Sequence, residues 1–356
     1  MVAALPPWVL RGEENFVQAV KTFRHINTDQ IGSVLVTFLS IAWLCLPHTA
    51  WAADKVRIGY SGATVSNAML WVTEEGKLFQ KNGIDPEVLY LQTTLGQTAM
   101  IAGEIHMCVY SASLLAPARL QGADVVMVTS FLNKPIYRLV VRPEIRTVAD
   151  LKGKRLGITR FGTVTDWTTR LLVSRLGLDP EKDVSLVQVG DVPVLLTSLT
   201  AAKTIDGAII QPPYYLKAVA SGMHVLANMQ EMDIPFQQTG LNTTQKFIAK
   251  SPDVVRRAVK AIIEGIHLMR VNPAVAKRAI AKRMQIKDEK ELEDSYQLLR
   301  SFIQVKPYPS LEGFKTIFAE IGKRVPAAKN ADAKDYVDTR FIEELDRSGF
   351  IDGLYR

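Results

Sequence analysis

Ile101-Ala-Gly-Glu-Ile-His-Met-Cys-Val109 and Leu199-Thr-Ala-Ala-Lys-Thr-Ile-Asp-Gly-Ala-Ile209 are two distant stretches of the chain that share one pattern. Each combines the end of a helix, a tight turn and a short apolar strand. A buried strand that directly follows a helix is typical of α/β proteins with parallel sheets. Because the pattern occurs twice, the sequence predicts two similarly built α/β lobes.

Short β-rich segments alternate with helical periodicity on both sides of these two stretches. From Lys55 onward we expect strands at 56–60, 88–91, 106–110 and 125–128. The pattern restarts at Thr147, with expected strands at 155–158, 184–187, 206–210 and 225–226. The last third is predicted to be helical, with Pro252 at the first position of a helix. Further helices are expected at about 274–283, 289–302, 311–322 and 336–347.

The N-terminal segment has the features of an export signal. Three basic residues, Arg11, Lys21 and Arg24, precede the apolar run 31–46, and Ala50-Trp51-Ala52 provides small residues at alternate positions. We therefore expect residues 1–52 to be a signal peptide, and the mature protein to be periplasmic without stable membrane insertion. The apolar run is shorter than the roughly 20 residues of a membrane span. A retained anchor and a later start codon stay open as alternatives.

Charge and composition disfavour several classes of protein. The net charge is +7, and the basic residues are dispersed without interleaved aromatic residues, so we expect no nucleic-acid partner. After cleavage the chain keeps Cys108 alone, in the middle of an expected strand, where a thiol usually packs in the core. Its histidines lack metal-site spacing, and catalytic motifs are missing. The sequence therefore predicts no metal, no cofactor and no enzymatic activity.

Small polar residues follow the expected strands, where open parallel sheets bind their ligands. The candidate ligand-binding residues of the first lobe are Ser61, Thr64, Thr93, Thr94, Gly96, Tyr110 and Ser111. Those of the second lobe are Arg160, Gly162, Thr163, Asp191, Gln211 and Tyr214.

Two of these turns, Thr93-Thr94 and Gly162-Thr163, directly precede expected helices. The first N–H groups of a helix are unpaired and can hold an anionic oxygen. Alternatively, the threonines are simple N-cap residues. Arg160 is the one cation of the set and could pair with a carboxylate or sulfonate, although an arginine after a strand is as often exposed to solvent.

Several short motifs occur in an order that resembles a known family. They are Arg57-Ile-Gly-Tyr60, Gly76-Lys-Leu-Phe79 with Asn82-Gly-Ile84, Ala102-Gly-Glu-Ile105, Leu139-Val-Val-Arg-Pro143, Asp150-Leu-Lys-Gly-Lys-Arg-Leu-Gly157, Gly177-Leu-Asp-Pro180 and Asp206-Gly-Ala208. In this order they resemble the nitrate/taurine/sulfonate family of substrate-binding proteins of ABC importers. The resemblance implies a type II periplasmic-binding-protein fold, with two α/β lobes, a two-segment hinge and a helical C-terminal region.

The resemblance also implies a division of the chain and a function. Residues 53–142 and 236–356 would form the first lobe and 143–235 the second, with hinge segments near Arg142-Pro143 and 228–237. The protein would be a monomer that delivers a small molecule to an ABC transporter permease. Many relatives have a Trp-Glu-Pro-like turn where this chain has Gln211-Pro212-Pro213, so we expect a neutral or anionic organic solute.

Two other functions stay open at this point. Thiamine-pyrimidine synthases share this fold, so a related binding protein or a synthase-like enzyme is one alternative. Those enzymes carry a cysteine-rich iron-binding run that this chain lacks. The second alternative is a ligand-binding partner of a membrane sensor, because fold alone does not determine function.

Overall fold

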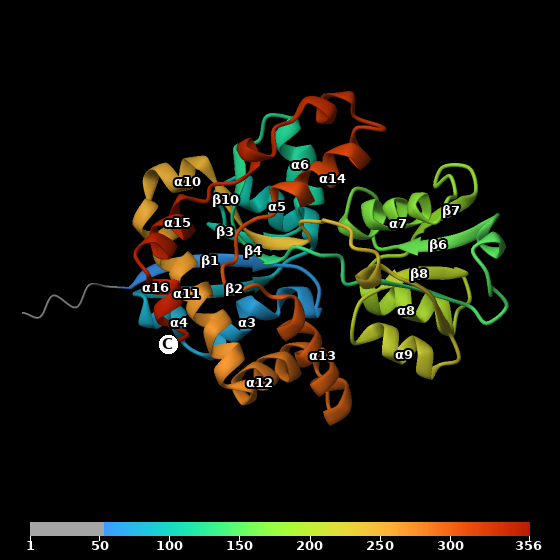
Figure 1. Ribbon diagram of the computed structural model, residues 1–356, viewed down its shortest axis with the longest axis horizontal. Coiled ribbons are helices and arrows are strands. Elements are labelled where there is room, and N and C mark those ends of the chain that lie inside the picture. Colours follow the sequence, from blue (N-terminus) through green and yellow to red (C-terminus); the bar gives the residue numbers. More distant parts are fainter. Residues whose placement is uncertain (1–52) are drawn as a thin grey trace, which may run out of the picture. The chain divides into compact units, whose positions relative to one another are not determined.

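The computed structural model describes residues 53–356. The predicted signal peptide and its cleavage site lie outside these described residues. Residues 53–356 form two lobes, and each lobe is built around one five-stranded sheet with helices on both faces (Figure 1). The two-lobed α/β architecture expected from the sequence is therefore confirmed.

The first lobe contains strands from both ends of the described chain. They are β1 (Asp54–Tyr60), β2 (Ile84–Tyr90), β3 (Met107–Tyr110), β4 (Val125–Leu132) and β10 (Thr239–Thr244). Their order in the sheet is β2-β1-β3-β10-β4. β1 is parallel to β2 and β3, whereas β10 is antiparallel to β3 and β4. The sheet is therefore mixed, and the late strand β10 is inserted between two early ones.

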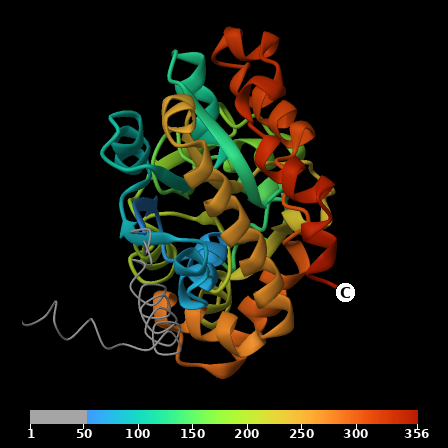
Figure 2. The same cartoon turned by 90° about the vertical axis from the view of Figure 1, so that its left-hand side faces the viewer.

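Helices from two parts of the chain cover this sheet. The early ones are η1 (Val65–Asn67), α3 (Ala68–Glu75), α4 (Leu78–Lys81), α5 (Thr93–Ile101) and α6 (Ala112–Leu120). The late ones are α10 (Gln245–Lys250), α11 (Pro252–Val271), α12 (Pro273–Met284), α13 (Glu289–Phe302), α14 (Leu311–Ile321), η4 (Pro326–Asn330), η5 (Ala333–Tyr336), α15 (Arg340–Arg347) and α16 (Phe350–Gly353). Figure 2 shows α11 crossing the lobe as its longest helix, and it begins at Pro252 as predicted.

The second lobe repeats the plan with a continuous stretch of chain. Its strands are β5 (Arg138–Val141), β6 (Lys154–Ile158), β7 (Val184–Gln188), β8 (Gly207–Ile210) and β9 (His224–Asn228). Their order is β7-β6-β8-β5-β9, with β6 parallel to β7 and β8, and β5 antiparallel to β8 and β9. Its helices are η2 (Ala149–Leu151), α7 (Val164–Arg175), α8 (Val192–Thr200), α9 (Tyr214–Ala220) and η3 (Met229–Glu231).

The chain crosses between the sheets twice, after Leu132 and again after Asn228. The sequence placed the first crossing near Arg142, which is later than it occurs, because Arg138–Val141 already pairs with β8 and β9 of the second sheet. The second crossing ends at Thr239, close to the expected hinge segment. The sequence analysis did not predict β5 or β10, the two strands that directly follow the crossings.

One other expected element differs from the structure. The helix predicted at about 336–347 is divided, because η5 ends at Tyr336 and α15 begins at Arg340. Between them, Val337 forms a β-bridge with Met127, and the Asp338 N–H donates to the Met127 carbonyl. This pairing with β4 holds the intervening residues in an extended conformation.

A buried apolar cluster joins the lobes on one side. Phe314 and Phe318 of α14 belong to the same cluster as Leu171 and Leu172 of α7, and all four side chains are buried. The lobes are therefore connected by a packed interface as well as by the two crossings.

Candidate ligand-binding site

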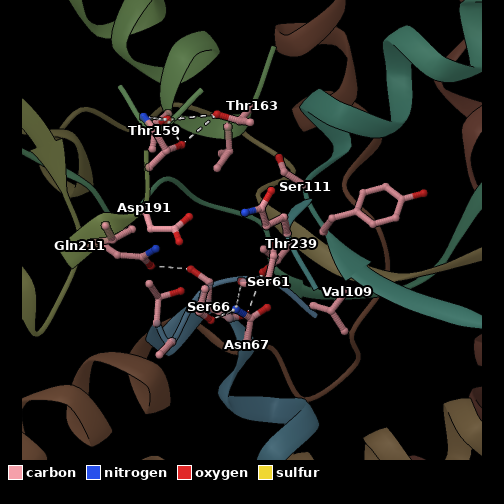
Figure 3. Close-up of a pocket in the computed structure, with 18 of the residues that line it drawn as sticks. Ser61, Ser66, Asn67, Val109, Ser111, Thr159, Thr163, Asp191, Gln211 and Thr239 are labelled. Carbon is pink, nitrogen blue, oxygen red and sulfur yellow. Dashed lines mark hydrogen bonds between the residues drawn. The ribbon is translucent and has the colours of Figure 1, made fainter. Parts of the chain in front are cut away.

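A pocket of about 230 Å³ lies between the lobes, where strands of the two sheets end (Figure 3). The loop after β1 and the end of β3 line it from the first lobe, and the loops after β6, β7 and β8 line it from the second. This is the edge at which open α/β sheets bind ligands. The volume suits a small organic molecule.

Most of the residues predicted from the sequence line this pocket. They are Ser61, Thr64, Tyr110, Ser111, Arg160, Thr163, Asp191, Gln211 and Tyr214. They come from five different strand ends on two sheets, so the structure brings together side chains that are far apart in the sequence.

Thr94, Gly96 and Gly162 do not line the pocket. Thr93 and Thr94 are the first two residues of α5 and directly follow the lining residue Gln92. Gly96 lies against the core, where a Cβ atom would be only 3.0 Å from the Cys108 Sγ.

Gly162 serves the turn between β6 and α7. Its φ is +78°, a conformation that favours glycine, and its N–H donates to Asp166 Oδ2 at 2.9 Å. This N–H group is therefore engaged within the turn and is not available to an anion. The predicted anion-binding role does not extend to Gly162.

The same turn is fixed by a cluster of threonine hydroxyls. Thr163 occupies the N-cap position of α7 without a side-chain capping bond; its Oγ1 instead donates to the Arg160 carbonyl at 2.7 Å. The Thr163 Oγ1 also lies 3.1 Å from both the Thr159 and the Thr165 hydroxyl oxygens. The cluster orients the backbone that carries Arg160, which is a structural role that neither sequence-based interpretation anticipated.

The sequence analysis missed other lining residues. They include Ser66, Asn67, Tyr90, Gln92, Tyr137, Thr159, Thr165 and Thr239. Asn67 holds the loop after β1, because its Nδ2 donates to the Ser61 and Gly62 carbonyls at 2.7 and 2.8 Å. Ser66 and Asn67 follow the first strand closely enough to be found by a search for polar residues after strands. Tyr137 and Thr239 adjoin the two crossings, so they could be found only if β5 and β10 had been predicted.

Both kinds of charge reach the pocket from the second lobe. Arg160 and Asp191 line it, and neither forms an ion pair within residues 53–356. Burial raises the pKa of Tyr90, and the nearby Asp191 and Tyr60 raise it further, while Arg160 lowers it. Burial also raises the pKa of Tyr214, with smaller contributions from Tyr90 and Glu291. Both phenols are therefore neutral near pH 7 and can donate hydrogen bonds.

A family model described as "NMT1/THI5 like" matches residues 64–276, more than half of the chain. The chain belongs to the NMT1/THI5-like family. The resemblance noted in the sequence is thereby confirmed at the level of family.

Relatives of this NMT1/THI5-like chain are named as binding proteins. A protein of Brucella abortus (strain 2308) named as a binding protein is 26% identical over 265 residues, covering 72% of this chain and 81% of that protein. A protein of Brachyspira hyodysenteriae named as an ABC transporter periplasmic binding protein is 24% identical over 179 residues, covering 50% of this chain and 49% of that one.

The fold matches a solved periplasmic binding protein. The aliphatic sulphonate binding protein SsuA from Escherichia coli superposes with a TM-score of 0.64 and 18% identity, covering 80% of this chain and 92% of SsuA. This similarity shows that the NMT1/THI5-like chain has the periplasmic-binding-protein fold.

Residues 53–356 contain no group of three or more His, Cys, Asp or Glu side chains placed to hold a metal ion. In the same range, no helix is both long and apolar enough to span a bilayer.

Cys108 gives a test of the packing role predicted for it. It is buried, and burial raises the pKa of its thiol to about 12, so the thiol is protonated at pH 8. Because the thiolate is the reactive form, we expect the folded protein to react with a disulfide reagent at least about a hundredfold more slowly than the urea-unfolded protein. The measurement is the rate of thiol release at pH 8. Equal rates would show that Cys108 is accessible.

Proposed function

We propose that this NMT1/THI5-like protein is the substrate-binding component of an ABC importer and captures a small organic solute between its lobes. The observation that carries the proposal is a pocket lined by strand ends of both sheets, so that closure of the lobes would surround a ligand. The relative from Brachyspira, which is named as part of an ABC transporter, supports the assignment.

The solute is proposed to be anionic or neutral. Arg160 is a half-buried cation without an ion-pair partner within residues 53–356, and Tyr90 and Tyr214 add neutral donors beside it. Asp191 is exposed at the pocket, which lets water screen its charge. The name of the structural relative SsuA, which refers to aliphatic sulphonates, is consistent with an oxyanion at Arg160.

The location and partners belong to the same proposal. The signal peptide would be removed after Ala52, and the mature protein would act as a periplasmic monomer that docks on a membrane permease. The periplasmic name of the Brachyspira relative supports this location. Amino-terminal sequencing of the protein recovered from the periplasm tests it, and a first residue other than Ala53 would contradict the cleavage site.

The importer role is tested by reconstitution. The permease and ATPase encoded beside this protein, placed in liposomes, should hydrolyse ATP faster when the mature protein and its solute are added together. If the adjacent reading frames encode a sensor kinase instead, and the solute-loaded protein stimulates that kinase, the sensor alternative replaces the importer.

Replacing Arg160 tests the ligand class. Arg160→Ala should weaken the binding of an alkanesulfonate such as 1-pentanesulfonate more than tenfold, or about 1.4 kcal/mol, because a charge-assisted hydrogen bond is lost. Arg175→Ala, which removes an exposed arginine at the end of α7, is the control and should leave binding unchanged. Unchanged affinity of the Arg160 variant in calorimetry would remove the anion-binding role.

A further inference from the structure

Ser66, Gln211 and Gln238 form a chain of hydrogen bonds between the lobes. Ser66 Oγ donates to Gln211 Oε1 at 2.5 Å, and Gln238 Nε2 donates to Ser66 Oγ at 2.9 Å. Gln238 Oε1 in turn accepts from the Ile136 backbone N–H at 3.1 Å. Ser66 belongs to the first lobe and Gln211 to the second, while Ile136 and Gln238 lie on the two crossings. The three side chains are 1% to 6% exposed.

The Ile136 backbone N–H sets the orientation of the Gln238 amide in this series of hydrogen bonds. A backbone N–H can only donate, so Gln238 must present its oxygen to Ile136 and its nitrogen to Ser66. The Ser66 hydroxyl accepts from Gln238 and donates its single hydrogen to Gln211 Oε1. The Gln211 amide is therefore held with its oxygen toward Ser66.

The fixed orientation leaves the Gln211 nitrogen for the pocket. Gln211 is 6% exposed, and its Nε2 has no hydrogen-bond partner within residues 53–356. Some polar side-chain atoms of residues 53–356 are completely buried without a hydrogen-bond partner, but Gln211 Nε2 is not one of them. It is therefore accessible from the pocket that Gln211 lines. Figure 3 shows the Gln211 oxygen turned to Ser66 and its nitrogen turned away from Ser66, on the side of Asp191. Because this donor faces the pocket, an acceptor oxygen of a ligand can bond to it there.

We propose that Gln211 Nε2 is a specificity-determining donor that binds an acceptor oxygen of the solute, and that Ser66 and Gln238 set its orientation. The proposal rests on the proposed function, because it assumes that the solute is captured in this pocket. Since the Ser66–Gln211 bond joins the lobes, the donor is oriented only when the lobes are together.

The identity of residue 211 determines the polarity of this part of the pocket. A glutamate there would accept from Ser66 with one oxygen and present the other as an acceptor, which would favour an ammonium group on the ligand. Gln211→Glu should therefore reverse the preference between acceptor and donor ligands. Ser66→Ala should release the amide, so that either end of Gln211 can face the pocket and the preference is weakened.

The first experiment compares two compounds with the same carbon chain, 1-pentanesulfonate and pentylamine, by calorimetry. Measurements at about pH 8 favour the ionised form of an introduced carboxyl, whose pKa burial raises. The sulfonate should bind the wild type at least tenfold more tightly than the amine, and Gln211→Glu should invert this order. Ser66→Ala should lose about tenfold in sulfonate affinity.

Ser130→Ala is the matched control for Ser66→Ala. The Ser130 hydroxyl is also buried and also bonds a glutamine of the second crossing, because it accepts from Gln237 Nε2 at 3.0 Å. Both partners lie outside the pocket lining. The control should retain the sulfonate affinity of the wild type, whatever its effect on stability.

The second experiment needs no ligand. Spin labels at Leu95→Cys on α5 and Val194→Cys on α8, both exposed positions of opposite lobes, report the distance between the lobes, while the buried Cys108 stays unlabelled. Ser66→Ala should shift the distance distribution to longer values, and Ser130→Ala should not.

Three results would overturn the proposal. The first is a wild type that prefers the amine or binds neither compound. The second is a Gln211→Glu variant that keeps the wild-type preference. The third is a Ser66→Ala variant that matches Ser130→Ala in both experiments. A failure of the importer role alone would leave both experiments unaffected, because neither of them uses the permease.

Discussion

Replacing Asp166 by alanine is expected to lower the free energy of unfolding by about 1–3 kcal/mol, because it removes one of the two carboxylate partners of the buried Arg170 guanidinium. Asp166 is 1% exposed, and its Oδ1 accepts from Arg170 Nε at 2.6 Å. In the variant, the buried Arg170 guanidinium would keep Glu181, at 2.5 Å from its Nη1, as its carboxylate partner. Urea denaturation monitored by circular dichroism measures the change.

The matched control is Asp294→Ala. Asp294 also pairs with a basic residue four positions away, Lys290, but Lys290 is largely exposed and Asp294 only half-buried, so the pair is expected to contribute little to stability. If the two variants lose the same stability, the buried pair has no special role. Asp166→Ala should also weaken solute binding, since Asp166 Oδ2 anchors Gly162 in the turn that carries Arg160.

Gly313→Ala is expected to lower the free energy of unfolding by about 1–3 kcal/mol or more, because the added methyl group has no space. A Cβ atom at Gly313 would lie 2.4 Å from the Gln237 nitrogen and 2.7 Å from the Phe236 carbonyl carbon. These are backbone atoms of the second crossing, which cannot rotate away as a flexible side chain could. The same denaturation experiment measures the loss.

Gly353→Ala is the control for this substitution. Gly353 also lies in a helix, α16, but a Cβ atom there would meet nothing within 4 Å. The control should be neutral or stabilising by up to about 1 kcal/mol, because alanine favours the helix. A Gly313 variant as stable as this control would show that α14 does not approach the crossing so closely.

The elements that the sequence did not reveal are short and polar. β10 has the sequence Thr-Gly-Leu-Asn-Thr-Thr, which shows neither apolar alternation nor an apolar run, yet all its residues are buried between β3 and β4. Its polar side chains are satisfied by distant partners: the Asn242 Nδ2 donates to the Cys108 and Tyr110 carbonyls. Periodicity within one segment cannot show pairing of this kind.

The sequence predicted those residues of the candidate site that follow an expected strand. Arg160 and Gln211 were found because each follows an apolar strand. Gln238 was not found, because its contact with Ser66 joins residues 172 positions apart. Gly96 and Gly162 were assigned to the ligand, but they serve packing and turn geometry, since a glycine after a strand has the same appearance in the sequence whichever role it has.

The central claim is that the protein captures a small solute between its lobes, and a thermal-shift screen of the mature protein tests it most directly. Sulfonates, carboxylates, ureido compounds, pyrimidines and aromatic acids would be compared, together with a variant, Ala63→Trp, that fills the pocket lined by Ala63. A ligand at about a hundred times its dissociation constant stabilises a protein by about 2.7 kcal/mol. We expect at least one compound to raise the melting temperature of the wild type and to leave that of Ala63→Trp unchanged. The claim would be contradicted if no compound stabilised the wild type, or if the filled pocket gave the same shift.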